Sequence, residues 1–294
     1  MHASRPASLT TGSAGTVTPS GAYTERVITV ATILMGAALL ALWRGLLWRG
    51  RDLPGVDRPQ PWLVGHRGVR GALPENSVAA FRAAYDAGLD GIETDVQRSR
   101  DGTLVLVHDT HVDGVEVTAL SVDELRRRVA DLATLEELFA LARAAPGTWL
   151  NLEIKTKGAG LSDVALVRAL TRSVRASGLA DRICVSSFDP LALAQLRLLA
   201  PELRTGYLWH DHPSVPRWLR TPWPAGWLHV DALHPHWSHV DADVVERARR
   251  RGLGLNVWTV NDADEVRRLL ALRVSGIMAD DPHALLRAAR GGPG

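Results

Sequence analysis

From about residue 60 onward, short apolar runs alternate with longer amphipathic runs, and this alternation restricts the folds open to the chain. The apolar runs have the length and composition of buried strands. We expect strands at 62–66, 91–96, 104–109, 149–155, 183–188, 205–209, 230–235, 255–260 and 276–280. Between them we expect helices that open on a capping Asn or Asp, at 76–88, 163–178, 241–252 and 262–273. Repeated strand–helix units predict a parallel sheet covered by helices.

The number of strand–helix units distinguishes a closed sheet from an open one. About eight units lie in the roughly 230 residues of 61–290, which fits a (β/α)8, or TIM, barrel. An open, doubly wound sheet is the alternative, and it usually carries a Gly-rich phosphate turn after its first strand. The corresponding segment GHRGVRG (65–71) has glycines without the G-x-G-x-x-G spacing. We therefore predict an α/β fold in which residues 61–290 form a TIM barrel.

One uncharged apolar run, VITVATILMGAALLALW (27–43), precedes the barrel region. Together with the apolar residues up to Trp48 it is long enough to span a bilayer, and Trp suits the membrane interface. We predict these segments outside the barrel: a disordered tail at 1–26, a single transmembrane helix at 27–48, a linker at 49–60 and a short tail at 291–294.

A cleaved signal peptide and a buried globular helix are the other interpretations of this run. The polar lead before it is long for a signal peptide, and no small-x-small cleavage site precedes the arginines. The polar tail and the Pro-containing linker disfavour a buried helix. Arginines are more numerous after the run than before it: Arg44, Arg49, Arg51 and Arg58 against Arg5 and Arg26. This bias favours a single-pass membrane protein with its C-terminal domain in the cytoplasm.

Charge and cysteine content exclude several classes of function. The net charge of +2 comes from scattered arginines and argues against a nucleic-acid partner, which normally requires a clustered basic face. The single Cys184 excludes an internal disulfide and a multi-cysteine metal site, and its apolar surroundings predict a packed thiol. The sequence leaves the oligomeric state open.

Polar residues gather at the predicted carboxyl ends of the strands, where a TIM barrel carries its active site. They are His66, Arg67, Glu93, Asp95, Glu153, Lys155, Ser187, His234, His236, Trp258, Asn261 and Asp280. Carboxylates, histidines and cations in one place are typical of a metal-assisted phosphate site.

The segment GIETDVQRSRDGTLVLVHD (91–109) supplies carboxylates and a histidine. Glu93 and Asp95 leave the same face of a strand, and paired hard oxygens suit Mg²⁺ or Ca²⁺. The Asp-Gly pair at 101–102 predicts a two-residue hairpin turn. In that register Asp95 faces His108, and directly opposed residues lie about 5 Å apart. A bulge or a longer loop would shift this pairing by one residue.

The chain has lysine at two positions, and both follow the apolar run WLNLEI: Lys155 and Lys157. Glu153 and Lys155 share one face at the end of this strand. They either neutralise each other or serve as a metal ligand and a phosphate contact. Lys157 precedes a Gly-rich loop, and we expect it to be solvated.

His66 and Arg67 end the first predicted strand. Arg67 offers a bidentate grip on phosphate oxygens, and His66 offers acid–base chemistry near neutral pH. Asn76 is expected to cap the following helix. Glu75 is either an acid stabilised by the dipole at the start of that helix or a partner of Arg67 or His66.

These motifs together, HRG, PENS, IETDV, DG, LVLVHD, LEIK, SSF, WTVND and GIMADDP, resemble the glycerophosphodiester phosphodiesterase family over roughly 62–290. The resemblance implies a TIM barrel, one divalent cation (Mg²⁺ or Ca²⁺), and hydrolysis of glycerophosphodiesters to glycerol 3-phosphate and an alcohol. It implies these roles by position: metal ligands Glu93, Asp95 and Glu153; an acid–base pair His66 and His108; phosphate contacts Arg67 and Lys155; and substrate-side residues Glu75 and Trp258.

The resemblance leaves alternatives open. A phospholipase-D-like relative acting on lysophospholipids fits the membrane helix, and so does a catalytically inactive, membrane-tethered binding barrel. His66 is the expected base and His108 the expected acid, with attack by the glycerol 2-hydroxyl through a cyclic phosphate or directly by water. His234 and His236 could hold a second metal, although a structured loop at the barrel rim is the favoured interpretation of 209–237.

Overall fold

The computed structural model describes residues 21–51, 60–71, 73–157, 163–211 and 215–291. It divides into two units, Met1–Trp43 and Arg44–Gly294. In the second unit each of eight strands pairs in parallel with the next, and the last, β12, also pairs with β1. The strands are β1 (Trp62–His66), β2 (Gly91–Arg98), β7 (Trp149–Ile154), β8 (Ile183–Ser187), β9 (Arg204–Trp209), β10 (Ala232–Pro235), β11 (Gly254–Val257) and β12 (Gly276–Ala279). The sheet is closed, which confirms the predicted TIM barrel.

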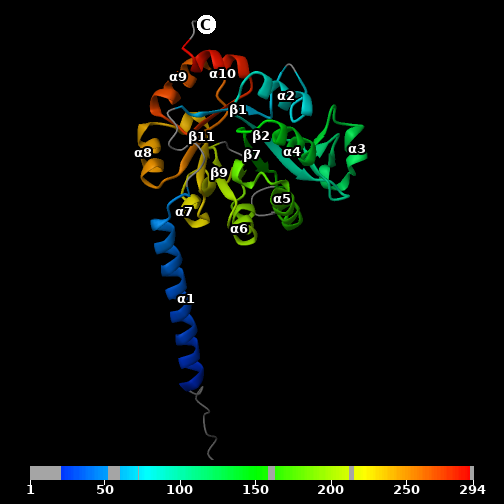
Figure 1. The fold of residues 1–294 in the computed structure, drawn as a ribbon. Coiled ribbons are helices and arrows are strands. Elements are labelled where there is room, and N and C mark those ends of the chain that lie inside the picture. The colour runs from blue at the N-terminus through cyan, green and yellow to red at the C-terminus, as the bar shows by residue number, and fades with distance from the viewer. Residues whose placement is uncertain (1–20, 52–59, 72, 158–162, 212–214, 292–294) are drawn as a thin grey trace, which may run out of the picture. The chain divides into compact units, whose positions relative to one another are not determined.

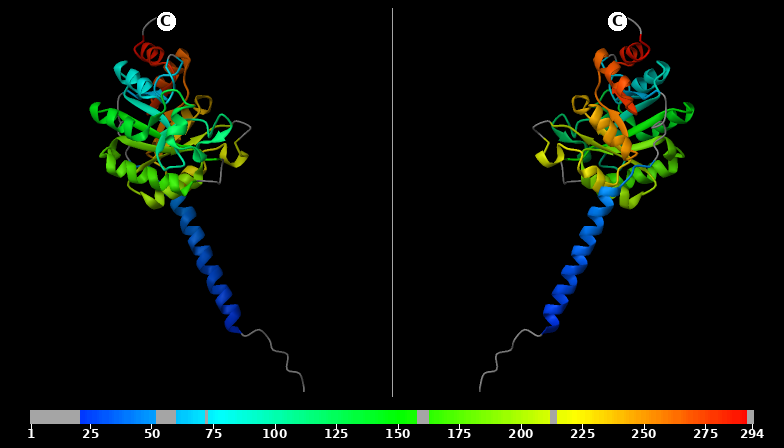
Figure 2. Two further views of the ribbon diagram at one scale, coloured as in Figure 1. Left: turned by 90° about the vertical axis from the view of Figure 1, so that its right-hand side faces the viewer. Right: turned by 90° about the vertical axis from the view of Figure 1, so that its left-hand side faces the viewer.

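Helices cover the outside of this barrel (Figure 1). Figure 2 shows the layer from two sides, with the orange helices α8 and α9 facing the viewer in the right-hand view. The helices are α2 (Val78–Asp86), α4 (Leu135–Ala144), α5 (Val164–Ser177), α6 (Pro190–Leu199), α7 (Pro224–Leu228), α8 (Ala242–Arg250), α9 (Ala263–Leu272) and α10 (Pro282–Ala289). Short 3-10 turns lie at Val117–Ala119, Ala180–Arg182, Arg217–Leu219 and Trp237–His239.

Helix caps follow the predicted pattern in three of four cases. The carboxylates of Asp163, Asp241 and Asp262 accept hydrogen bonds from backbone amides of the first helical turn, as predicted. The expected cap of α2 was wrong. Ser77, not Asn76, accepts a hydrogen bond from the amide of Ala80, and the Asn76 side chain hydrogen-bonds to Asp95 instead.

The barrel interior contains both apolar and polar side chains. Val64, Trp149, Cys184, Ala232 and Met278 form one apolar cluster, and Cys184 is a fully buried thiol, as predicted. The polar side chains of Asn151, Ser186, His234 and Asn256 are also buried. Asn151 hydrogen-bonds to Ser186, and Asn256 to His234, so these polar groups are partnered inside the fold.

The hairpin after β2 differs from its prediction. Strand β3 (Leu104–Leu106) pairs antiparallel with β2 and with β6 (Ala133–Thr134), outside the eight-stranded ring. Arg98 pairs with Leu104, and the Ser99 amide bonds to the Thr103 carbonyl, so the loop has three residues rather than two. Gly102 takes the left-handed conformation (φ 91°) that such a loop needs. The remaining elements here are β4 (His111–Val112), β5 (Val115–Glu116) and α3 (Val122–Arg126).

The N-terminal helix α1 (Gly21–Leu47) begins earlier than predicted. Its segment Glu25–Leu47, with a mean hydropathy of 1.9, is long and apolar enough to cross a membrane, although a signal sequence would satisfy the same criterion. The rest of the predicted tail, 1–20, lies outside the described residues, as do 52–59 of the predicted linker and 292–294 of the C-terminal tail.

Residues 49–51 do not behave as a free linker. The Gly50 amide donates to the Arg251 carbonyl (2.8 Å). The Arg51 guanidinium donates through Nε and Nη2 to the fully buried Asp231 carboxylate, at 2.9 and 2.7 Å. Asp231 directly precedes β10, so the chain is attached at the amino ends of the strands.

Packing in the barrel interior gives a stability prediction. A Cβ added at Gly206 would lie 2.6 Å from Nε2 of the fully buried His234, which has no space to retreat. We expect Gly206→Ala to destabilise the folded chain by about 1–3 kcal/mol, the usual cost of overpacking. Thermal unfolding of the full chain in detergent measures it. Gly36→Ala is the matched control, because nothing lies within 4 Å of its added Cβ. Equal melting temperatures for the two variants would contradict this packing.

Candidate active site

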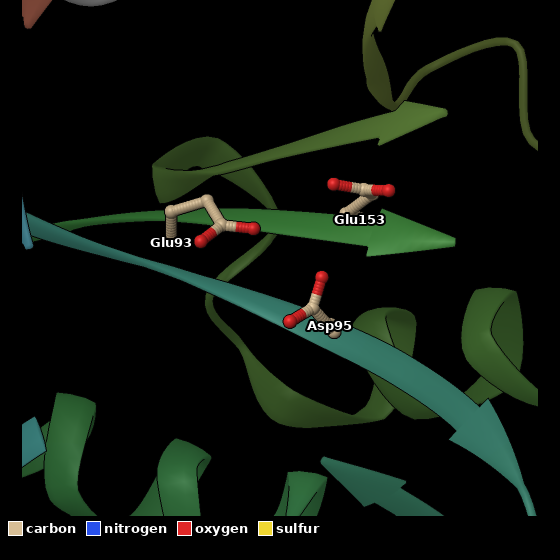
Figure 3. Close-up of side chains that lie close together, drawn as sticks. All are labelled: Glu93, Asp95 and Glu153. Carbon is tan, nitrogen blue, oxygen red and sulfur yellow. The ribbon is translucent and has the colours of Figure 1, made fainter. Parts of the chain in front are cut away.

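Three carboxylates converge at the carboxyl ends of β2 and β7. Glu93 and Asp95 leave one face of β2, and Glu153 leaves β7 at the position paired with Asp95. One oxygen from each lies within 4.8 Å of the others, although the three side chains are almost fully buried. Figure 3 shows the three carboxylates turned towards one another. The alternation of side chains along β2 places Glu93 and Asp95 on one face, and the parallel pairing of β2 with β7 brings Glu153 beside them.

Two cations partly neutralise the cluster. Nζ of Lys155 lies 2.6 Å from Glu153 Oε1 and 3.1 Å from Asp95 Oδ1. Nε of Arg67 lies 3.3 Å from Asp95 Oδ2, and the Arg67 backbone amide donates to Glu93 Oε2 (3.0 Å). The two alternatives for Lys155 are therefore compatible, since it pairs with Glu153 and also lines the cavity described below. Lys157 instead pairs with the exposed Glu116 on the surface.

The electrostatics of the cluster are unbalanced. Burial raises the pKa of Glu93 well above its ordinary value, and the charges of Asp95 and Glu153 raise it further. Burial also raises the pKa of Glu153, although Lys155 opposes this effect. For Asp95, burial is outweighed by Lys155 and Arg67, and its pKa is lowered. The carboxylates in turn raise the pKa of Lys155 despite its burial.

This arrangement fits a divalent cation. Three hard oxygen donors on two rigid strands are the ligand type that Mg²⁺ and Ca²⁺ prefer. Within the described residues, Asp95 Oδ1 is buried and has Lys155 Nζ at 3.1 Å as its charge partner, without a hydrogen bond of acceptable geometry. Three buried carboxylates face two cationic side chains, and a divalent cation would balance the remaining negative charge. Glu93, Asp95 and Glu153 are therefore the residues that could hold it.

His66 is held by a carboxylate from the other end of the chain. Its Nδ1 lies 2.6 Å from Oδ1 of Asp280, directly after β12. The Asn261 side-chain amide donates to Asp280 Oδ2 (2.7 Å), and the Asp280 amide donates back to Asn261 Oδ1 (3.0 Å). Because an ionised carboxylate can only accept, His66 carries its proton on Nδ1 and leaves Nε2 for chemistry. Nε2 lies 3.9 Å from Glu93 Oε2.

His108 reaches the same cavity, but not by the predicted pairing. The three-residue loop places Val107 opposite Asp95, with the Val107 amide donating to the Asp95 carbonyl (3.0 Å). Strand β3 ends at Leu106, and the chain then bends, so His108 need not follow strand parity. Nε2 of Gln97 fixes the bend by donating to the carbonyls of Val107 (2.9 Å) and Asp109 (2.8 Å). The Asp109 carboxylate lies 2.8 Å from His108 Nδ1.

The turn after β1 is shaped by two left-handed residues, Arg67 and Asn76, both with φ 55°. Glu75 binds the Arg67 guanidinium through Oε1 (2.8 Å), so it is a partner of Arg67 rather than a mere helix-turn acid. Asn76 donates to Asp95 Oδ2 (2.9 Å) and accepts from the Thr94 hydroxyl (2.6 Å). Non-glycine residues in this conformation are strained and occur where the surroundings require them.

A cavity of about 580 Å³ opens above the cluster. His66, Arg67, Glu93, His108, Glu153, Lys155 and Trp258 all line it. Trp258 meets Phe188 edge to face, with ring centroids 5.5 Å apart, and donates through Nε1 to the His234 carbonyl (2.7 Å). One side of the cavity is thus charged and the other is apolar. His234 lies fully buried against Asn256, so it is not available to share a metal with His236.

Comparison with known proteins identifies the family. Residues 66–284 match the model of the glycerophosphoryl diester phosphodiesterase family. The chain belongs to this family. A glycerophosphodiester phosphodiesterase of Caldanaerobacter subterraneus subsp. tengcongensis is 31% identical, over 78% of this chain and 98% of its own length. The predicted family resemblance is confirmed.

Solved structures of similar proteins share the fold of this family member. A putative glycerophosphodiester phosphodiesterase of Galdieria sulphuraria superposes with a TM-score of 0.69 at 27% identity, covering 78% of this chain and 98% of its own. A phosphodiesterase of Oleispira antarctica, in complex with the product sn-glycerol-3-phosphate, gives 0.68 at 26% identity, covering 79% and 97%. This chain is thereby placed among the phosphoric diester hydrolases.

Three side chains of this family member were given no site role from sequence. Asp280 and Asn261 stood among the polar strand ends, but their link to His66 depends on the closure of β12 onto β1. Gln97 leaves the same face of β2 as Glu93 and Asp95, and this alternation could have predicted that it lies near the site.

The raised pKa of Glu93 predicts how pH and cations affect stability. Between its ordinary value of 4.5 and its raised value, the folded metal-free chain binds more protons than the unfolded chain. Stability of the metal-free chain should therefore fall as pH rises through this range. A divalent cation needs ionised carboxylates, so Mg²⁺ should raise the melting temperature increasingly as pH rises.

Thermal unfolding with EDTA or Mg²⁺ across this pH range measures both effects. Glu93→Gln should abolish the stabilisation by Mg²⁺, and it should make the metal-free chain more stable at the upper end of the range because it removes a buried repulsive charge. Glu116→Gln, on the surface, should change neither the stabilisation by Mg²⁺ nor the stability of the metal-free chain. Stabilisation by Mg²⁺ that persists in Glu93→Gln would contradict the assignment.

Proposed function

We propose that the chain hydrolyses glycerophosphodiesters to sn-glycerol 3-phosphate and an alcohol. One observation carries the proposal: two histidines, each with its Nδ1 beside a carboxylate, line one cavity together with the carboxylate cluster and two cations. The glycerol 3-phosphate bound by the Oleispira antarctica relative supports the choice of substrate class.

The two histidines act as the acid–base pair. His66 Nε2 accepts the proton of the attacking hydroxyl, and His108 Nε2 donates a proton to the leaving alkoxide as the P–O bond breaks. With the glycerol 2-hydroxyl as attacker, water then opens the cyclic phosphate with the two roles reversed. With water as attacker, one step completes the reaction. The Asn261–Asp280 pair keeps Nε2 of His66 directed away from Asp280 in either route.

A divalent cation, Mg²⁺ or Ca²⁺, held by Glu93, Asp95 and Glu153 would lower the pKa of a bound hydroxyl and polarise the phosphoryl oxygens. Arg67 and Lys155 face the same cavity and stabilise the charge that develops on phosphorus. Glu75 fixes the Arg67 guanidinium, and Trp258 with Phe188 provides an apolar wall for the glycerol or alcohol carbons.

We further propose that α1 is a single-pass membrane anchor with the barrel on the cytoplasmic side. The apolar segment Glu25–Leu47 and the excess of arginines after it support this orientation. Protease protection of the barrel domain in sealed, oriented vesicles tests the side. Digestion of the barrel from the non-cytoplasmic side would exclude it.

Release of glycerol 3-phosphate by the full chain tests the catalytic proposal. We expect turnover of glycerophosphocholine that EDTA abolishes and Mg²⁺ or Ca²⁺ restores. His66→Ala and His108→Ala should each lower kcat by about 10²- to 10⁴-fold while Mg²⁺ still stabilises the fold. Near-full activity of His108→Ala would exclude its role. Absence of turnover would favour an inert binding barrel, and a preference for lysophosphatidylcholine would favour the lysophospholipid alternative.

The shape of the Lys155 cation gives a separate prediction. Lys155 places a compact point charge between two carboxylates, whereas arginine would spread its charge over a wider, planar guanidinium. We expect Lys155→Arg to lower kcat by about 10²-fold despite conserving charge. Lys157→Arg is the matched control two residues away, and it should be nearly silent because Lys157 pairs with Glu116 at the surface. Equal activities of the two variants would refute this assignment.

A further inference from the structure

The amino ends of the barrel strands carry the attachment of residues 44–51. Nε1 of Trp48 donates to the Val230 carbonyl (2.7 Å), and its ring stacks on His229 with centroids 4.4 Å apart. Arg51 forms the buried pair with Asp231. Residues 229–231 directly precede β10, so this attachment lies at the end of the barrel opposite the catalytic cavity.

Exposed apolar side chains concentrate around this attachment. In the described part of the barrel unit, large hydrophobic residues are exposed at seven positions: Leu46, Leu47, Val164, Leu191, Leu198, Trp223 and Trp227. Val164 and Leu191 begin helices at the catalytic end. We assign the other five to the end of the barrel where residues 44–51 attach, since Leu198 is near the end of α6 and both tryptophans belong to α7 and its N-cap, where Gly226 and Trp227 lie close to Gly45. Leu198 is the most exposed, at 84%.

Arginines surround these apolar side chains. Arg44 and Arg49 flank the attachment, and the end of α8 adds Arg247, Arg249, Arg250 and Arg251, all exposed. Glu246 pairs with Arg249 and Arg250, and Glu202, close enough to act on Arg51, pairs with Arg175. We call these arginines, together with Leu46, Leu47, Leu198, Trp223 and Trp227, the basal surface.

A groove of about 510 Å³ lies between α7 and α8 and reaches the basal surface, where Arg250 and Arg251 line it. The buried side chains of Trp209 and Leu253 make part of its lining apolar, and the exposed Trp223 and Arg247 line it as well. Apolar side chains beside arginines match an anionic phospholipid, whose acyl carbons and phosphate need both. Exposed Trp and Leu beside Arg is also the composition of protein segments that lie in a membrane interface.

We propose that the basal surface rests on the headgroup layer of an anionic bilayer. The proposal rests on the proposed membrane span of α1, because the candidate span ends at Leu47, itself part of the basal surface. Trp48, Gly50 and Arg51, the residues that follow this end, all hydrogen-bond to the barrel. The catalytic cavity, at the opposite end of the barrel, then opens to water, and substrate reaches it from solution rather than from the same bilayer.

Two positions on one helix provide the test. Leu198 and Leu191 both lie exposed on α6, at the basal and catalytic ends respectively. The fully buried Cys184 thiol, with its pKa raised by burial, does not compete for label. The full chain carrying Leu198→Cys or Leu191→Cys is labelled with bimane and reconstituted in phosphatidylcholine–phosphatidylglycerol vesicles containing doxyl-labelled lipid. We expect several-fold stronger quenching at position 198 than at 191, and equal quenching would overturn the proposal.

The charge is tested in the Leu198→Cys background. Arg247→Glu with Arg250→Glu should reduce the quenching, and vesicles of phosphatidylcholine alone should reduce it similarly. If neither the double substitution nor the neutral vesicles changes the quenching, the proposal of an anionic bilayer is overturned. Quenching at position 198 that disappears when the chain is diluted in the vesicles would instead show a second copy on this surface, and would also overturn the proposal.

Failure of the underlying proposals gives different results. Extraction of the unlabelled chain from the vesicles by alkali would show that α1 does not span the membrane, whatever the quenching. Loss of glycerol 3-phosphate release in the same vesicles would concern the catalytic proposal alone, since none of the substituted residues lines the catalytic cavity.

Discussion

Mutual repulsion of three buried carboxylates is the constraint on which the rest of the site depends. Glu93, Asp95 and Glu153 are held within 4.8 Å by two rigid strands, so the fold cannot relieve their repulsion by moving them apart. Lys155 and Arg67 compensate part of the charge, while burial, and after it the charges of Asp95 and Glu153, raise the pKa of Glu93. A divalent cation held by the cluster, as we propose, would complete the balance, so the imbalance that disfavours the metal-free chain would favour metal binding.

A second set of polar groups keeps the reactive side chains in place. Asn76 orients Asp95, the Asn261–Asp280 pair orients His66, and Gln97 fixes the loop that carries His108. These contacts join the first, second and last strands of the barrel. Under the proposed mechanism, closure of the sheet matters for catalysis as well as for stability, because His66 obtains its Asp280 partner only where β12 meets β1.

Much of this arrangement follows from the sequence because strand periodicity is local. The shared faces of Glu93 with Asp95 and of Glu153 with Lys155 needed only alternation along each of two strands, and the eight barrel strands were predicted from apolar runs of the right length. The hairpin register could not be predicted from the sequence, because the same Asp-Gly pair is compatible with a two-residue and with a three-residue loop. The role of Asp280 could not be derived either, since it depends on a contact across 214 residues of chain. Asn76 and Ser77 are adjacent and both have side chains that can cap a helix, so the sequence alone does not distinguish them. Ser77 caps α2, because the Asn76 side chain hydrogen-bonds to Asp95 instead.

We propose that one divalent cation completes the carboxylate cluster and that Lys155 lies beside the cation rather than replacing it. Anomalous diffraction from a crystal of the full chain soaked in Mn²⁺ tests this arrangement. We expect one anomalous peak within coordination range of Glu93, Asp95 and Glu153, with Nζ of Lys155 moved away from Asp95 towards the cavity. No peak at the cluster, with Lys155 still bridging Asp95 and Glu153, would contradict it.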